Sequence, residues 1–310
     1  MTSVLVTGGC GFVGCNLVEP LLKAGFGSVI VFDNESGGTR GHLGDLPVEF
    51  IHGDLRDAEA VDAAVAHADL VVHLAADTRV VDSIDDPTTN FDVNVAGTLN
   101  LLHAMRRHDK RRIVNASTGG AILGDVAPPV HEDMVPRPIS PYGASKLAVE
   151  GYLSAFEGSY GLQPISFRFS NLYGTRSFHK GSVVAAFYKL LLRGERLPVY
   201  GDGEQTRDLL YVEDLSSVIV DALNHEVTGV YQLGRGEPVS VNQLIRQIAG
   251  VVGWDLSDRV DYLPARLGEV AHSYCDTSRA RETLGFDPTT ELSEGLTLTW
   301  EWFRSAWVDA

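Results

Sequence analysis

Thr7-Gly8-Gly9-Cys10-Gly11-Phe12-Val13-Gly14 is the stretch that decides the fold of this chain. It follows a β-branched run at 4–6, and its glycines satisfy both the G-x-x-G-x-x-G and the G-x-G-x-x-G spacing. Because glycine lacks a Cβ, the backbone can approach a pyrophosphate closely, and the next helix offers amide donors and a positive dipole at its N-terminus. The stretch therefore predicts a strand, a phosphate-binding turn and a helix.

Similar apolar runs alternate with longer helical stretches through the first two thirds of the chain. Short β-branched runs are typical of buried parallel strands, and parallel strands need helical crossovers. The expected strands are 4–6, 29–32, 50–51, 70–74, 113–114 and 165–167, and the expected helices are 12–24, 58–66, 91–107 and 142–160. We predict an α/β protein with a doubly wound parallel Rossmann sheet.

The alternation ends after Arg168, where stretches punctuated by Gly and Pro begin. Later helices are expected near 212–223, 241–252 and 292–305, with a strand at 230–233. We interpret 1–170 and 207–235 as a dinucleotide-binding domain. The remaining stretches, 171–206 and 236–310, are interpreted as a smaller C-terminal region that binds the substrate.

Two acidic residues lie where expected strands end. Asp33 follows Gly14 by nineteen residues, a place where a carboxylate accepts hydrogen bonds from the ribose hydroxyls and repels a 2′-phosphate. This spacing favours NAD over NADP. Asp54, at the end of the third strand, is either an acceptor for the adenine amino group or a surface carboxylate.

Tyr142 and Lys146 lie four residues apart at the start of an expected helix, so they share one face. Lowering the pKa of a phenol from near 10 toward 7 requires roughly 4 kcal/mol, which an adjacent ammonium and a cationic nicotinamide ring can supply. Tyr142 would then be a competent acid/base at neutral pH.

Ser117 and Thr118 lie at the carboxyl end of the fifth expected strand, where open α/β sheets bind their ligands. Either hydroxyl can hydrogen-bond the reacting oxygen, and we favour Thr118. The alternative is that both hydroxyls satisfy nearby backbone groups.

With these segments the chain resembles the extended short-chain dehydrogenase/reductase family, and within it the nucleotide-sugar epimerases and dehydratases. The resemblance covers nearly the whole length. Besides the segments already quoted, it rests on 53–55, 73–76, 94–98, Arg168 with Asn171, 200–203, 206–208 and 266–269, in that order.

The resemblance implies NAD as cofactor and a nucleotide-diphosphate sugar as substrate. It implies that the catalytic residues are Tyr142, Lys146, Thr118 and Ser117. It places NAD on Gly8, Gly11, Phe12, Val13, Gly14, Asp33, Asn34, Asp54, Leu55, Leu74, Ala75, Ala76, Asn94, Tyr142 and Lys146. It places the substrate on Thr118, Tyr142, Asn171, Tyr200, Arg207 and Arg266.

Segment 178–181 is expected to open a helix beside the sugar. His179 or Lys180 would then meet a sugar hydroxyl or carboxylate, unless the segment is an exposed helix start.

The leading functional hypothesis is an NAD-dependent nucleotide-sugar 4-epimerase that acts through a transient 4-keto sugar. The alternatives are a 4,6-dehydratase, a sugar-acid decarboxylase, a 4-ketoreductase or a dinucleotide-sensing protein without activity. Dehydratases of the family carry Asp-Glu directly after their Thr, whereas Gly119 and Gly120 follow Thr118 here. Leu123 stands where many relatives have Tyr, which leaves the alignment of the two hydroxyls ambiguous.

The composition excludes other classes. The chain has 41 acidic and 25 basic side chains, a net charge of −16 at pH 7, so we expect no nucleic-acid or membrane partner. The three cysteines and ten histidines show no metal-binding spacing, so no metal is expected. No signal-peptide or membrane-spanning pattern is present, and we expect a cytoplasmic protein.

A homodimer is expected from the helices at 91–107 and 142–160. Their apolar residues lie on more than one face: Leu99, Leu101, Leu102, Leu147, Leu153 and Phe156. The resemblance implies that these helices pair into a four-helix bundle between two subunits.

Overall fold

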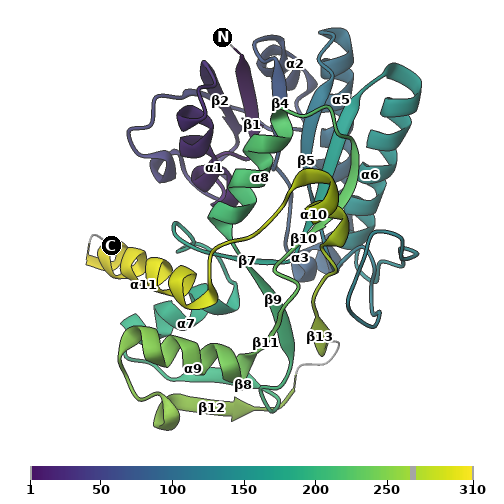
Figure 1. Ribbon diagram of the computed structural model, residues 1–310. Helices are drawn as coiled ribbons and strands as arrows, with labels where there is room; N and C mark the ends of the chain where they lie inside the picture. The colour runs from purple at the N-terminus through teal and green to yellow at the C-terminus, as the bar shows by residue number, and fades with distance from the viewer. Residues whose placement is uncertain (1, 266–269, 309–310) are drawn as a thin grey trace.

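A seven-stranded parallel sheet forms the centre of the larger part of the molecule (Figure 1). The structure is a computed structural model that describes residues 2–265 and 270–308. The strand order is β10-β6-β5-β4-β1-β2-β3. The strands are β1 (Ser3–Thr7), β2 (Ser28–Asp33), β3 (Glu49–His52), β4 (Leu70–His73), β5 (Arg112–Thr118), β6 (Gln163–Phe169) and β10 (Gly229–Leu233).

Helices cover both faces of this sheet, because alternate side chains of each strand point to opposite faces. Helices α1 (Phe12–Lys23) and α8 (Val212–Leu223) enclose one buried core, which includes Val4, Val6 and Val31. Helices α2 (Ala58–Ala66), α5 (Gly97–Arg107) and α6 (Pro141–Tyr160) enclose the other, which includes Leu5 and Ile30. The predicted Rossmann sheet is confirmed.

The stretch expected to be a helix at 91–107 is helical throughout, but a π-helical turn that was not expected lies within it. Two short helices, α3 (Val80–Asp85) and α4 (Pro87–Phe91), precede a π-helical turn, η2 (Asp92–Ala96), and α5 follows it. π turns recur at functional sites because they redirect side chains of a helix. Asn94 lies in this turn.

A smaller region lies below the sheet in Figure 1. Its strands are β7 (Asn171–Tyr173), β9 (Thr206–Tyr211), β11 (Pro238–Ser240) and β13 (His272–Ser273) in one sheet, with β8 (Leu197–Tyr200) and β12 (Val260–Leu263) in another. Helices α7 (Val183–Leu192), α9 (Val241–Val252) and α11 (Leu292–Val308) pack around a core that contains Tyr188 and Phe303. Single turns, η1 (Arg40–Leu43) and η3 (Ser257–Arg259), complete the elements.

Two elements lie elsewhere than the expected boundaries place them. Strand β9 pairs with β7, β11 and β13 of the smaller region, not with the large sheet. Helix α10 (Ser278–Leu284) packs against β10, and Ala280 belongs to the core of the large sheet. The partners of β9 and α10 are distant in the chain, so local sequence carries little signal for where these elements pack.

The two regions are tied together beside the glycine-rich turn. The Thr175 hydroxyl donates to Asn16 Oδ1 (2.9 Å), and Asn16 Nδ2 donates to the main-chain oxygen of Thr175 (3.1 Å). Arg176 Nη1 donates to the main-chain oxygen of Cys15 (2.6 Å). The segment after β7 is therefore anchored on α1.

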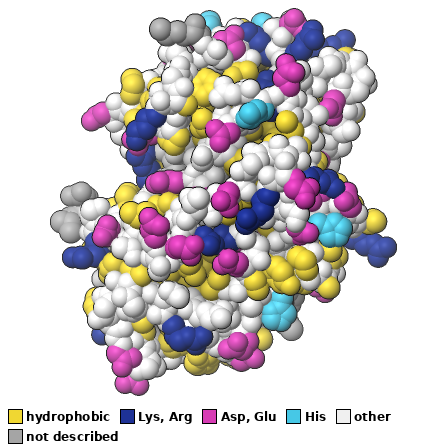
Figure 2. Space-filling view, in the orientation of Figure 1, with side chains coloured by type: hydrophobic (Ala, Val, Ile, Leu, Met, Phe, Trp, Pro, Cys, Tyr) yellow, Lys and Arg dark blue, Asp and Glu magenta, His cyan; other side chains and the backbone are white. Residues whose placement is uncertain are grey.

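Most of the apolar residues from which a dimer was predicted are buried in the core of the subunit. They therefore do not support the dimer prediction. Leu101, Leu102, Leu153 and Phe156 are buried in the core under α5 and α6, and Leu99 packs against the same core. None of the helices in the described ranges combines the length and apolar character that a membrane crossing needs. Acidic and basic side chains are interspersed over the face in Figure 2.

Candidate active site

The glycine-rich turn between β1 and α1 fits a dinucleotide closely. Gly8 has a φ of 72°, and a Cβ there would lie 2.6 Å from the main-chain nitrogen of Ala75. A Cβ on Gly14 would lie 2.5 Å from the main-chain oxygen of Gly8. Helix α1 begins at Phe12 with no side-chain cap and no acidic residue in its first turn. Its amide donors, including those of Phe12 and Val13, are thus left for an anionic ligand.

Asp33 is fixed at the end of β2. Its carboxylate accepts hydrogen bonds from the main-chain N–H groups of Cys10 (2.9 Å) and Glu35 (2.7 Å). Burial raises the pKa of Asp33, and both hydrogen bonds oppose this rise. The structure therefore places a carboxylate beside the turn, where the sequence predicted one.

The other expected cofactor residues border the same edge of the sheet. Arg56 donates three hydrogen bonds to Asp54, from its main-chain N–H (2.9 Å), Nε (2.9 Å) and Nη2 (2.8 Å), and Asn34 Nδ2 donates a fourth (2.9 Å). The pKa of Asp54 is therefore far below its usual range. Leu55 is buried. The segment Leu74 to Ala76 directly follows β4 and is partly buried.

Helix α6 carries Tyr142 and Lys146, and its first residues explain where it starts. Ser140 caps the helix by accepting from the N–H of Gly143 (3.1 Å), and Pro141 occupies the first helical position. Lys146 is 5% exposed, and its Nζ donates to the main-chain oxygen of Ala116 (3.0 Å) in β5. This bond ties the helix to the strand that ends in Thr118.

The Thr118 side chain lies beside the Tyr142 phenol and acts on its pKa. Burial raises the pKa of Tyr142 to about 12, although the Thr118 hydroxyl lowers it; the charge of Asp77 adds to the rise. Burial also lowers the pKa of Lys146 to about 8. The net effect of these groups is thus to raise the phenol pKa, contrary to the expectation that Lys146 would help to lower it.

Ser117 points to a different partner, which the sequence did not reveal. Its hydroxyl donates to Glu150 Oε1 (2.5 Å), and Arg168 donates to both oxygens of that carboxylate (3.0 Å from Nε to Oε1 and 2.6 Å from Nη2 to Oε2). The two hydroxyls therefore differ in their partners, and Thr118, which we favoured from the sequence, is the one that is not bonded to Glu150. The available signal was the spacing, since Glu150 follows Lys146 by four residues and shares its helix face.

A chain of hydrogen bonds joins the glycine-rich turn to α6. Thr98 donates its proton to the main-chain oxygen of Asn94 (2.5 Å), so it accepts from His73 Nε2 (2.9 Å). His73 Nδ1 is then an acceptor for Thr7 (2.8 Å). Burial, helped by the charge of Lys146, lowers the pKa of His73 to about 3, so the ring is neutral.

Asn94 extends this series of hydrogen bonds to α6. Its Nδ2 donates to Ser145 Oγ (3.0 Å) and to the main-chain oxygen of Asp77 (2.9 Å), and its Oδ1 accepts from the N–H of Asp77 (2.7 Å). The side chain is thus engaged within the protein and holds α6 against the loop after β4.

Three expected substrate residues meet in the smaller region. A pocket of about 260 Å³ is lined by Tyr200, Asp202, Gln205 and Ala271, among others. Arg207 Nη1 donates to the main-chain oxygens of Thr206 (2.8 Å) and Ala271 (3.5 Å), beside this pocket. Asn171 is exposed and pairs with Leu209, so it shares a sheet face with Arg207. Arg266 lies outside the described residues.

His179 and Lys180 lie beside the glycine-rich turn between β1 and α1. The helix expected to open at 178–181 begins later, at Val183. The rings of His179 and His42 stack with 4.8 Å between centroids, and His42 Nδ1 donates to the main-chain oxygen of Cys10 (3.1 Å). Lys180 Nζ lies 4.4 Å from the centre of the Phe12 ring, and burial lowers the pKa of Lys180 to about 8. The structure thus places both side chains beside the start of α1.

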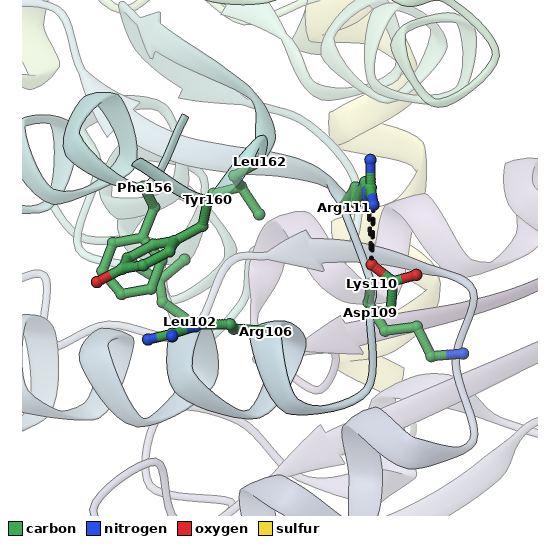
Figure 3. A pocket seen from close by; sticks show the side chains of 8 residues that line it. All are labelled: Leu102, Arg106, Asp109, Lys110, Arg111, Phe156, Tyr160 and Leu162. Atoms are coloured by element: carbon green, nitrogen blue, oxygen red, sulfur yellow. Dashed lines mark hydrogen bonds and ion pairs between the residues drawn. The ribbon is translucent and has the colours of Figure 1, made fainter. Parts of the chain in front are cut away.

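A second, smaller pocket of about 40 Å³ lies near the opposite ends of the strands (Figure 3). It is lined by Arg106, Phe156, Tyr160 and Arg111, which precedes β5. Its position separates it from Thr118, the last residue of that strand. In the part of the chain that the structure describes, His, Cys, Asp and Glu form no group of three that could hold a metal ion.

The chain belongs to the NAD-dependent epimerase/dehydratase family, whose model matches residues 4–234. It is 38% identical over 310 residues to a UDP-glucose 4-epimerase of Mycolicibacterium smegmatis, covering 97% of this chain and 98% of that protein. The crystal structure of a Thermotoga maritima UDP-glucose 4-epimerase with UDP-glucose has a TM-score of 0.94 at 36% identity, over 99% of this chain and 100% of that one. A Thermus thermophilus UDP-glucose 4-epimerase in complex with NAD has a TM-score of 0.90 at 37% identity, over 98% and 100%.

These comparisons confirm three expectations. The chain is a member of the nucleotide-sugar epimerase group, NAD is its cofactor, and it is an NAD-dependent epimerase of nucleotide sugars.

Proposed function

We propose that this enzyme inverts C4 of a UDP-hexose, with Tyr142 as the acid/base. The observation that carries the assignment is the position of Tyr142 beside Thr118 at the carboxyl edge of the sheet, with Lys146 one helical turn away. The relatives named UDP-glucose 4-epimerase support UDP-glucose as the first substrate to test.

The glycine-rich turn and Asp33 would hold NAD, with Asn34, Asp54 and Lys146 bordering it. Their fit rests on the free amide donors at the N-terminus of α1 and on the Asp33 carboxylate fixed beside the turn. When bound, NAD supplies a hydride acceptor that is also the hydride donor for the return step, and it carries a positive ring that lowers the pKa of a nearby phenol. Among the described groups that act on Tyr142, the Thr118 side chain is the one that lowers its pKa.

Tyr142 takes the proton of the C4 hydroxyl as C4 becomes a ketone, and it returns a proton when the opposite face of C4 is reduced. Thr118 donates a hydrogen bond to the reacting oxygen, and Lys146 supplies positive charge beside the phenolate. No net oxidation of the sugar results. The ketone must turn over between the two steps, so the sugar pocket has to permit rotation.

Arg207 would bind the diphosphate because guanidinium groups match phosphate oxygens in pairs. Asn171 would act beside it, and the pocket at Tyr200 would take the base and ribose. We assign the stretches around β7, β8, β9 and α9 to substrate binding and the large sheet to NAD.

The 4,6-dehydratase alternative conflicts with the residues after Thr118. A Cβ on Gly119 would lie 3.1 Å from Gln232 Oε1 and 3.2 Å from the main-chain oxygen of Phe169, so a side chain there would require its neighbours to shift, and neither Gly119 nor Gly120 supplies an acid. Elimination needs such an acid to protonate the departing hydroxyl.

The test is incubation of the purified protein with UDP-, dTDP-, GDP- and CDP-sugars, followed by NMR. Inversion at C4 without loss of water or carbon dioxide is the expected result. Loss of water would indicate the dehydratase, loss of carbon dioxide the decarboxylase, and a net consumption of reduced cofactor the 4-ketoreductase.

A homodimer is part of the proposal, now supported by other residues than the leucines. Helices α3 and α4 both contact α6. Together they expose Val81 (69%), Ile84 (59%), Phe91 (55%) and Tyr152 (42%). Such an apolar surface favours a partner, and a second copy is the partner that the family resemblance implies. The reduced thiols of all three cysteines support a cytoplasmic location.

A further inference from the structure

A buried ion pair lies directly behind the candidate active site. Arg168 Nη2 and Glu150 Oε2 are 2.6 Å apart, and the side chains of the two residues are 5% and 6% exposed. Burying two charges costs about as much free energy as their attraction returns, so a buried pair contributes little net stability. Its presence at this position calls for another role.

Glu150 also accepts a hydrogen bond from Ser117, one of the two hydroxyl residues at the end of β5. Ser117 Oγ donates to Glu150 Oε1 over 2.5 Å. Since a hydroxyl has one proton, Ser117 cannot donate to a substrate oxygen at the same time. Glu150 therefore leaves Thr118 as the donor at the end of β5.

Lys146 is the second member that Glu150 influences. The two residues lie four apart on α6, and burial of Lys146 lowers its pKa to about 8, an effect that the Glu150 carboxylate opposes. The other titratable groups at this end of α6 are His73 on β4, which is neutral, Arg168 on β6, which pairs with Glu150, Tyr142 on α6, and Asp77, whose charge acts on Tyr142. Towards η2 the helix meets the uncharged Asn94. Among these groups, Glu150 is the one that favours the charged lysine.

We propose that Glu150, held by Arg168, is a positioning residue that keeps Lys146 in its ammonium form and turns Ser117 away from the reacting oxygen. The inference rests on the proposed roles of Lys146 and Thr118. It predicts opposite effects for the two members of the pair. Removing the carboxylate makes Lys146 easier to deprotonate, whereas removing the guanidinium leaves the carboxylate unopposed and makes deprotonation harder.

The experiment measures NAD affinity by calorimetry, on protein freed of nucleotide, and sugar turnover, both from pH 6 to pH 10. NAD affinity and turnover should both fall at high pH. In Glu150→Gln the midpoint of this fall should lie about one pH unit lower than in the unmodified enzyme. Arg168→Met should shift it in the alkaline direction. Ser117→Ala is the matched control, because it removes a hydrogen bond to Glu150 without changing a charge, and it should leave the profile in place.

Shifts in the same direction for both variants, or no shift in either, would overturn the proposal. If a single variant does not fold, the apolar pair Glu150→Leu with Arg168→Met avoids a lone buried charge. It should still shift the profile toward acid, because the carboxylate nearest Lys146 is lost, and an unmoved profile would count against the inference. Failure of the proposed epimerisation would appear separately, as absent turnover with intact NAD binding.

Discussion

The Asp33 carboxylate accepts a hydrogen bond from the main-chain N–H of Cys10 over 2.9 Å, so the acid that ends β2 is fastened to the glycine-rich turn. The same carboxylate accepts from the N–H of Glu35, which brings a second acidic residue to this edge of the sheet. Asp33 and Glu35 are therefore close together at the edge of the sheet where the proposed NAD site would place the ribose.

Asp33→Ala should reduce the preference for NAD over NADP, because it removes one of these charges. Asp33→Ala combined with Glu35→Ala should reduce it further. Dissociation constants for both cofactors provide the measurement, with Asp45→Ala, an exposed acid on the same loop, as the control. An unchanged ratio in the double variant would mean that shape, not charge, selects the cofactor.

Tyr142→Phe should lower turnover by about 10² to 10⁴-fold, the loss that is typical when a general acid/base is removed. Folding and NAD binding should survive, because ring volume is preserved. Tyr152→Phe, an exposed position of the same helix, is the matched control and should keep full activity. Near-normal turnover of Tyr142→Phe would refute the assignment of the acid/base.

Thr118→Val and Ser117→Ala should separate turnover from stability. Thr118→Val removes the hydroxyl beside Tyr142 and should cost about 10²-fold in turnover. Ser117→Ala removes a hydrogen bond to a carboxylate and should cost about 1.5–3 kcal/mol in the free energy of unfolding, with little effect on turnover. Steady-state kinetics and urea unfolding measure the two quantities, and the reverse pattern would make Ser117 the donor.

His73 should make the protein sensitive to acid. Its pKa is about 3 in the folded protein and 6.5 when the ring is exposed to water, so the unfolded chain binds a proton that the folded chain does not. Below about pH 6.5 this residue should lower the free energy of unfolding by about 1.4 kcal/mol per pH unit, and above that pH it should have no effect. His73→Gln should be less stable at pH 8 but lose stability less steeply on acidification. Equal slopes in urea unfolding between pH 6.5 and 4 would disprove this role.

Phe91→Glu should convert a dimer into monomers, because a carboxylate would replace an exposed ring at the proposed contact. Light scattering at micromolar concentration gives the mass. Leu298→Glu, on α11 and 39% exposed, is the control and should stay dimeric. A monomeric mass for the unmodified protein would remove the dimer from the proposal.

The sequence predicted the large sheet well because its strands are buried on both faces and appear as continuous apolar runs. Helices α2, α8 and α9 begin and end at the expected residues. The short helices α3 and α4 and the turn η2 were not expected, since five or six residues are too few to show a helical period.

The site was predictable as a set of residue types but not as a set of contacts. Tyr142 and Lys146 share a helix face, which spacing alone predicts. The choice between Ser117 and Thr118 depends on Glu150, which reaches β5 from another element, and such a tertiary contact leaves no local pattern. The leucines of α5 led to a wrong argument for the dimer for the same reason. Only the tertiary structure shows that they are buried against the sheet of their own subunit.

The smaller region is assembled from stretches of chain on either side of α8 and β10, and β9 joins them by pairing with β7 from the first stretch and with β11 and β13 from the second. A chimera meant to take its sugar preference from a relative would consequently have to receive both stretches of the smaller region from that relative. A single crossover would leave a hybrid sheet with mismatched edges. Evolution of new specificity in such an architecture is therefore easier by point substitution around Tyr200 and Arg207 than by recombination of whole segments.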